Sequence, residues 1–263
     1  MRRRRLSPYP APLDRLPPSV AAALTGQGGA VAPVVPTHWF QPSAANAEFL
    51  TAANASYPAT GGFIAIINPT AIGSTRGGII DLRGTGAVWM AIVPGAPDTL
   101  RLSVNIGGAA RNLNVAFPGG DAALYDGAPK VAWGRWEQGG NAECGWGKPS
   151  DGNTSGVLST PSTVADATAT ASVGNVAGAN SSIGGEYEIA AFTGALTDAM
   201  INAVVDALSI VSVTAGRFLY PRPAAGVSDG DAITDPSTQV TDDTAHTWTI
   251  STVDGTSSIQ AAT

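Results

Sequence analysis

Two glutamates stand two positions apart in a stretch that alternates as a β-strand does. Glu186 and Glu188 belong to segment 183–193, where we predict that Ile189 and Ala191 point to one face and both glutamates to the other. Residues at i and i+2 of a strand lie about 7 Å apart, and paired carboxylates at such separations perform glycoside hydrolysis. The alternative to a catalytic pair is that both glutamates lie on a solvent-exposed strand face. We favour this alternative, because a motif without its structural context is a hypothesis only.

Aspartates gather towards the C-terminus, where their oxygens could serve as ligands for Ca²⁺. They are Asp229, Asp231, Asp235, Asp242 and Asp243. Their spacing departs from the calcium-loop pattern D-x-[DN]-x-[DN]-G, although Asp229-Gly-Asp231 is faintly similar to its beginning. We therefore predict a solvated acidic loop and no metal site.

Histidine and cysteine are too rare for most catalytic or metal-binding patterns. His38 and His246 are few and far apart in the sequence, which disfavours a zinc site. Cys144 is the sole cysteine, which excludes an intrachain disulfide, and we expect it to pack as a small apolar side chain. The sequence has neither a Walker phosphate loop nor a G-x-S-x-G elbow. It thus predicts no catalytic residue and no cofactor.

Tryptophans are a further residue type with a chemistry of its own. Trp89, Trp136 and Trp146 lie in predicted strands, and their rings could form a platform on which sugars stack. Large apolar side chains of this kind are more often part of a core. Glycan binding through these residues is therefore the second interpretation that we carry forward.

Both ends of the chain offer candidate partner-binding residues. The first group is a block of like charges, made up of Arg2, Arg3, Arg4 and Arg5. It could anchor the chain on nucleic acid or on an acidic protein face, and the alternative is a frayed terminus without a partner. Trp39 and Phe40 close the proline-rich N-terminal segment, and Trp248 lies in a predicted C-terminal strand. We expect these aromatic residues to dock on the sandwich or on a neighbouring subunit.

Composition narrows the class of protein. Charged residues make up 13% of the 263 residues, against about 25% in ordinary soluble domains. A surface this poor in charge suits a subunit whose faces are buried against neighbours; a soluble domain rich in small residues is the alternative. The net charge of −6 argues against general nucleic-acid binding by the folded part. We predict no signal peptide, because prolines follow the arginines, and no membrane span.

The pattern of prolines, apolar runs and turns predicts three regions: a proline-rich arm (1–45), a sandwich (46–213), and an extension with an edge or donated strand (214–263). The predicted strands of the sandwich are Phe63–Asn68, Gly77–Arg83, Ala87–Val93, Leu100–Ile106, Leu113–Phe117, Lys130–Trp136 and Ala142–Gly147. Segment 151–179 is predicted as a loop with one weak strand over 169–173. Edge strands are expected over Ile210–Val213 and Arg217–Tyr220, and a longer strand over Ala245–Val253.

A short helix is predicted directly after the strand that holds the two glutamates. Thr197 is a good N-cap, and apolar residues recur at helical spacing up to Leu208. The strand and the helix together resemble the closing part of the laminin-G-like, concanavalin-A-like jelly-roll family, with its run "G-x-x-x-E-x-x-x-F-x-x-x-L-T-D". The matching residues are Gly184, Glu188, Phe192, Leu196, Thr197 and Asp198. Gly77 to Leu82 also resembles the second core strand of that family.

The resemblance covers about Phe63 to Leu208 and implies the fold. An all-β, antiparallel sandwich of jelly-roll type is expected, with one short helix after the closing strand and extended arms at both ends. Glucanases of this fold carry an E-x-D-x-x-E run. Here Glu188 stands at the position of the central Asp and the final Glu is missing, which disfavours hydrolysis.

The leading functional expectation is a non-enzymatic virion structural protein of a bacteriophage or phage-like particle. It would decorate the capsid or belong to the tail, form homo-oligomers, dock on other virion proteins through its arms and present the sandwich outward. The competing expectation is a carbohydrate-binding module that recognises host-surface glycans. A glucanase-like hydrolase is the weakest. Fold resemblance alone does not decide among them.

Overall fold

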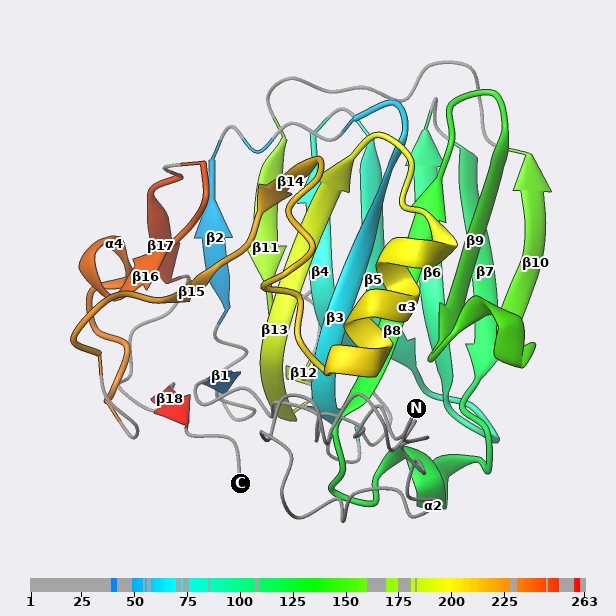
Figure 1. The fold of residues 1–263 in the computed structure, drawn as a ribbon, viewed down its shortest axis with the longest axis horizontal. Coiled ribbons are helices and arrows are strands. Elements are labelled where there is room, and N and C mark those ends of the chain that lie inside the picture. The colour runs from blue at the N-terminus through cyan, green and yellow to red at the C-terminus, as the bar shows by residue number, and fades with distance from the viewer. Residues whose placement is uncertain are drawn as a thin grey trace, which may run out of the picture.

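A computed structural model describes residues 39–41, 49–53, 55, 58–69, 72, 76–84, 86–106, 109–159, 169–174, 181–182, 184–227, 231–244, 246–250 and 258–260. Two large sheets pack face to face, and a helix lies on the outside of one of them (Figure 1). This confirms the predicted β-sandwich. The arginine block at positions 2–5, His38 and Asp229 lie outside the described residues.

The first sheet, called sheet A, holds the closing strand of the predicted sandwich. Its strands are β1 (Trp39–Gln41), β3 (Gly61–Pro69), β8 (Lys130–Trp136), β9 (Asn141–Trp146), β10 (Thr154–Ser159), β13 (Gly184–Thr193), β14 (Arg217–Leu219) and β18 (Ser258–Gln260). They follow the order β10-β9-β8-β3-β13-β1-β18, and β14 also pairs with β13. All of these pairs are antiparallel.

The second sheet, called sheet B, carries four consecutive antiparallel strands from the middle of the chain. Its strands are β2 (Leu50–Ala52), β4 (Gly77–Arg83), β5 (Ala87–Val93), β6 (Thr99–Ile106), β7 (Ala109–Ala116), β11 (Thr170–Val173), β12 (Ser181–Ser182) and β17 (Trp248–Ile250). They follow the order β17-β2-β11-β4-β5-β6-β7, and β12 pairs with β4 in parallel. A separate small sheet joins β15 (Arg222–Pro223) to β16 (Val240–Thr241).

The predicted helix is α3 (Asp198–Ala207), and Thr197 caps it as expected. The Thr197 hydroxyl accepts a hydrogen bond from the Met200 amide at 3.3 Å. The structure adds helices of a single turn that the sequence did not predict: α2 (Asp121–Leu124), α4 (Pro236–Gln239) and the 3₁₀ turn η2 (Pro149–Asp151). Within the described ranges, no helix is both long and apolar enough to cross a membrane.

Sheet A is buried on both faces, which explains the unbroken apolar run of β3. Phe63, Ala65 and Ile67 point into the core between the sheets, whereas Ile64 and Ile66 point into a second core under α3. From α3, the second core receives the buried side chains of Ile201 and Val204. Sheet B has the main core on one face only, so polar side chains alternate with core residues towards its other face.

The structure differs from the sequence prediction at the edges of the sheets. Strand β10 lies in the segment that we predicted as a loop, whereas the weak strand predicted over 169–173 is β11. The expected edge strand at Ile210–Val213 is instead a turn, in which the Val213 amide donates to the Ile210 carbonyl at 2.9 Å. Both side chains fill the core under α3. Burial against the helix therefore outweighs the local β-propensity.

The C-terminal strand pairs within its own chain. β17 joins the edge of sheet B through β2, with Trp248 opposite Ala52. The Trp248 side chain is 1% exposed and belongs to the main core. Of the two expected arrangements, docking on the sandwich or on a neighbouring subunit, Trp248 shows the first: its ring completes the sandwich of this chain.

Candidate functional site

Seven side chains form one continuous row across the outer face of sheet B. Pairwise register places them directly opposite one another from strand to strand. In order, they are Thr249, Thr51, Ser172, Asp81, Trp89, Ser103 and Asn112. We call this set the polar row. Opposed residues on neighbouring strands share a face and lie within contact distance of each other.

Strand alternation shows that the polar row faces away from the main core. Leu82, Val88 and Leu102, which neighbour its members along the strands, all belong to the core between the sheets. Successive side chains point to opposite faces, so Asp81, Trp89 and Ser103 lie on the outer face. Consistent with this, Trp89 belongs to a small apolar cluster that is separate from the main core.

The centre of the polar row is buried although it lies on an outer sheet face. Asp81 and Ser103 are each 1% exposed and Ser172 is 8% exposed. Among the described residues, these are three of the four buried polar or charged residues, the other being Lys130. Buried polar groups need partners, so their concentration in one row marks it as the candidate site.

Asp81 is the most unusual residue of the row. Its Oδ2 accepts a bond from Arg83 Nε at 3.1 Å, whereas its buried Oδ1 has no hydrogen-bond partner. Burial raises the pKa of Asp81 from 3.8 to about 6, and the charge of Arg83 opposes this only in part. Near neutral pH, the site therefore holds a carboxylate with one oxygen that can still accept a hydrogen bond.

Arginines surround the centre of the row. The guanidinium carbon of Arg76 lies 4.6 Å from the Trp89 ring centroid, in the arrangement of a cation–π contact. Arg101 stands opposite Ala91 and donates from Nε to Asn114 Oδ1 at 2.7 Å. Burial, and then the charge of Arg76, lower the pKa of Arg101. These guanidinium groups make the surroundings of the row positive in a protein whose net charge is −6.

The three predicted glycan-binding tryptophans do not form one platform. Trp136 and Trp146 are 2% and 1% exposed and belong to the main core, where their indole N–H groups donate to the carbonyls of Pro58 and Val115. Their rings are therefore held inside the sandwich, which corrects that part of the prediction. Trp89 alone lies in the candidate site, where Arg76 covers its ring. Strand alternation predicts on which face of the sheet a tryptophan ring lies, but it does not predict which side chains cover that ring.

The backbone that carries the predicted pair of glutamates departs from a regular strand. A β-bulge falls between them: Glu186 stands opposite Ile67 and Glu188 opposite the adjacent Ile66. Ile67 points into the main core and Ile66 towards α3. The extra residue of the bulge, Tyr187, thus breaks the two-residue spacing on which the carboxylate-pair hypothesis depended.

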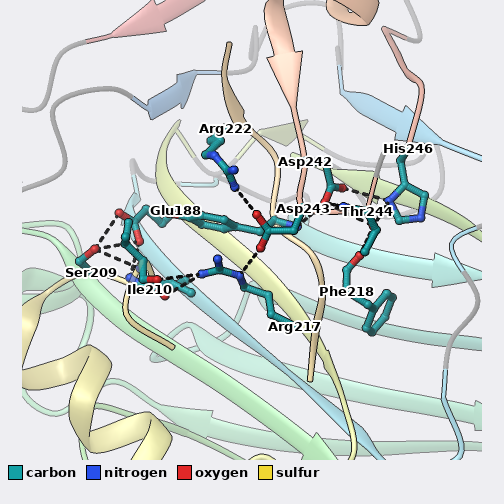
Figure 2. A network of polar contacts seen from close by, with 12 residues as sticks. Glu188, Ser209, Ile210, Arg217, Phe218, Arg222, Asp242, Asp243, Thr244 and His246 are labelled. Atoms are coloured by element: carbon teal, nitrogen blue, oxygen red, sulfur yellow. Dashed lines mark hydrogen bonds and ion pairs between the residues drawn. The ribbon is translucent and has the colours of Figure 1, made fainter. Parts of the chain in front are cut away.

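Glu188 is instead a structural acceptor under the segment that follows α3 (Figure 2). It accepts a bond from Ser209 Oγ at 3.1 Å and another from the Ile210 amide. Burial raises its pKa, and the bonds from Ile210, Ser209 and Tyr220 oppose that effect. Unlike Asp81, this partly buried carboxylate has partners on both oxygens.

Two aspartates of the predicted acidic loop belong to the same network (Figure 2). Asp243 accepts bonds from Arg217 Nε at 2.6 Å and Arg222 Nη1 at 2.7 Å, and these two ion pairs lower its pKa. Asp242 contacts His246 Nδ1 at 3.0 Å. The two carboxylates therefore fasten residues 242–246 to the segment that contains β14.

The N-terminal aromatic residues are placed by the backbone of β1. Phe40 stands opposite Glu186 of β13 and opposite Ile259 of β18, so this short strand lies between the two. Trp39 stands opposite Gln260. Strand β1 thus joins the arm to sheet A of the same chain, whereas the polar row lies on sheet B.

A cavity of about 250 Å³ opens between the end of α3 and the start of β8. Phe117, Lys130, Val205 and Leu208 are among the residues that line it. The Lys130 ammonium group already donates to Asp126 and to the Ala128 carbonyl. The polar row thus remains the candidate site, because its carboxylate has an oxygen without a partner.

Sequence reasoning found Trp89 but missed Asp81, Ser103, Ser172 and Arg76. Asp81 interrupts an apolar run in β4, which is a weak signal of an outward-facing residue. Its distance in sequence from Ser103 and Ser172 hides the grouping, because only the register of five paired strands brings these residues into one row.

Comparison with known proteins finds solved structures that resemble this chain at low sequence identity. No protein-family model matches the chain, and no curated protein matches its sequence. Domains LG4-5 of the mouse laminin alpha1 chain match with a TM-score of 0.44 at 15% identity, over 59% of this chain and 40% of that one. A pentraxin from Limulus polyphemus matches with 0.48 at 13% identity, over 65% and 82%.

A tailspike protein from an Escherichia coli O157:H7 bacteriophage matches with a TM-score of 0.49 at 16% identity. The match covers 64% of this chain but only 24% of the tailspike. The two antiparallel sheets described above confirm the predicted sandwich by themselves. At such identities the likenesses to solved structures concern the fold alone.

Proposed function

We propose that this protein is a non-enzymatic, lectin-like sandwich that binds saccharides at the polar row of sheet B. The observation that carries the proposal is Asp81, whose buried Oδ1 lacks a partner. A buried acceptor of this kind costs free energy unless something donates to it. A saccharide hydroxyl is a donor of suitable size, and carboxylates readily accept bonds from hydroxyl groups.

The rest of the row supplies what saccharide recognition needs. Ser103 and Ser172 carry hydroxyl groups that both donate and accept, and Asn112 adds an exposed amide. The Trp89 indole, which is 8% exposed beneath Arg76, adds an apolar edge next to these groups. An apolar wall with a few converging polar groups is the usual composition of a small-molecule site.

The cost of Asp81 to the fold supports the same conclusion. Because burial raises its pKa to about 6, the ionised carboxylate weakens the native state at neutral pH. An asparagine or serine at this position would avoid that cost. Residues that lower stability are typical of functional sites, where activity is kept at the expense of stability.

A glycan array with the full-length chain tests the proposal. We expect specific binding that falls at least tenfold in Trp89→Ala and in Asp81→Asn, since each removes one main contact of about 1.4 kcal/mol or more. Glu188→Gln is the matched control, because it removes a partly buried carboxylate on sheet A. It should leave binding unchanged.

Two outcomes would contradict the proposal. The first is the absence of binding to any saccharide while the thermal unfolding of the chain shows a folded protein. The second is binding that Trp89→Ala and Asp81→Asn leave intact, because the saccharide would then contact another surface.

We propose in addition that the chain is a structural subunit of a bacteriophage or phage-like particle, on its capsid or in its tail. The observation that favours this second function is the charge-poor composition, with 13% charged residues. Extensive subunit contacts bury surface that must be low in charge. The N-terminal arginines would then contact an acidic partner within the particle.

Deletion of residues 2–38, which leaves strand β1 in place, tests the assembly proposal. Co-expressed with the coat proteins of its own particle, the shortened chain should be absent from purified particles, whereas the full chain is incorporated. Thermal unfolding and glycan binding of the shortened chain serve as controls for its fold. Equal incorporation of both chains would show that the arm is not needed for assembly.

A further inference from the structure

The polar row is flanked by two guanidinium groups that have no acidic partner among the described residues. Arg76 contacts the Trp89 ring, and Arg101 donates to the neutral amide of Asn114. Neither forms an ion pair with a described carboxylate, whereas Arg83 beside them pairs with Asp81. Uncompensated arginines this close to one another are unfavourable, because like charges repel.

The geometry brings both groups to the same spot. Trp89 stands opposite Ser103, and Arg101 lies two residues before Ser103 on the same strand face. It is thus a diagonal neighbour of Trp89, within reach of a long side chain. Arg76 lies over the same ring at 4.6 Å. Burial, and then the charge of Arg76, lower the pKa of Arg101, in keeping with this proximity.

A guanidinium group stacked on an aromatic ring keeps its N–H edge available. Arginine donates from five N–H groups in one plane, and contact with the indole face uses none of them. Arg101 uses one of its N–H groups, Nε, to donate to Asn114. The two side chains therefore present several parallel donors beside the polar row, which is the arrangement that binds carboxylate or sulfate oxygens.

We infer that the polar row selects saccharides that carry an anionic group, a carboxylate or a sulfate, and that Arg76 and Arg101 bind this group beside Trp89. The inference rests on the proposed saccharide binding and names the class of saccharide. The neutral part of the ligand lies along the polar row, beside the Trp89 ring. The negative charge of the bound anion offsets the repulsion between the two positively charged arginines.

The test uses an array that carries each saccharide in neutral, carboxylated and sulfated form, with the full-length chain and its variants. We expect the charged forms to bind about tenfold more tightly than their neutral counterparts, and this preference to disappear in Arg76→Gln and in Arg101→Gln. The carboxylated and sulfated spots distinguish the two sources of the anion, and a preference for either supports the inference.

Arg111→Gln is the matched control. Arg111 is an exposed arginine on β7, opposite the core residue Val104, so it lies outside the polar row. Its replacement removes the same charge and should leave the preference intact. If Arg111→Gln weakens binding as much as the other two variants, the preference reflects net charge alone and the inference fails.

Thermal unfolding gives a second measurement on the same proteins. A charged saccharide from the array should raise the Tm of the wild type and raise that of the Arg76→Gln/Arg101→Gln double variant much less. Equal binding of neutral and charged forms, still dependent on Trp89 and Asp81, would overturn the inference and leave the proposed function standing. Binding that depends on none of these residues would overturn both.

Discussion

At the scale of single residues, the buried carboxylate of Asp81 and the partly buried carboxylate of Glu188 illustrate opposite roles. Glu188 receives bonds from a serine hydroxyl and a backbone amide on its two oxygens, so its burial is compensated. Asp81 pairs with one half-exposed arginine and leaves Oδ1 without a partner. Burial raises the pKa of both groups. Only Asp81 combines that cost with an open acceptor, and for this reason we place it at the centre of the candidate site.

The raised pKa of Asp81 gives a prediction for stability against pH. Its folded pKa of about 6 exceeds the unfolded value of 3.8, so its contribution is fully present below about pH 4 and is lost as the pH rises through 6. Asp81→Asn removes this titration. The variant should match the wild type near pH 4 and be about 1–3 kcal/mol more stable at pH 7.

Urea unfolding of both proteins between pH 4 and 8 measures this difference. Arg83→Gln is a useful companion, because it removes the partner of Asp81 and should raise the apparent pKa further. A constant difference between wild type and Asp81→Asn across this range would show that Asp81 ionises normally in the folded protein.

At the scale of elements, α3 closes sheet A and depends on its first turn. Thr197 adopts an extended conformation and accepts a bond from the Met200 amide. The helix places Ile201 and Val204 on the outer face of sheet A, where both are fully buried. A helix of ten residues has little stability of its own, so the cap and the packing act together.

Loss of the cap should therefore weaken the whole sandwich. We predict that Thr197→Ala lowers the free energy of unfolding by about 1 kcal/mol. Thr197→Ser keeps the hydroxyl group and should stay close to the wild type. Denaturant unfolding checks both variants, and equal losses in the two would mean that the threonine methyl group, rather than the hydroxyl, provides the stabilisation.

At the scale of the whole molecule, a polar network fastens the C-terminal part to the sandwich (Figure 2). Arg217, whose side chain is 6% exposed, bonds Asp243 and also the Ile210 carbonyl. Arg222 bonds the second oxygen of Asp243. The network thus connects the turn after α3 with residues 242–246, and β17 follows directly to extend sheet B.

Asp243→Asn should loosen this connection in a pH-dependent way. The two arginines lower the pKa of Asp243, so its stabilising contribution exists above the unfolded pKa and disappears as the pH falls through the folded value. We predict a loss of about 1–2 kcal/mol at pH 7 and earlier proteolytic cleavage near residues 224–244. At a pH below both pKa values, the variant and the wild type should be equally stable.

Much of the fold was predictable from the sequence, because strand alternation and helix capping are local. The strands around Phe63, Trp89 and Trp133 and the cap at Thr197 were all predicted and are confirmed. The turn at Ile210–Val213 and the strand β10 were not, because burial against distant elements decided them. Whether Asp81 opposes Trp89 depends on the bulge between Gly78 and Ile80.

The sequence by itself determined which residues face inward and which face outward on each strand, since a period of two needs no information from elsewhere in the chain. Only the tertiary structure decided which outward residues meet. The polar row draws on residues from Thr51 to Thr249, and a shift of one residue in any pairing would scatter them. Register is set by contacts between distant segments, and for that physical reason the candidate site appears only in the folded molecule.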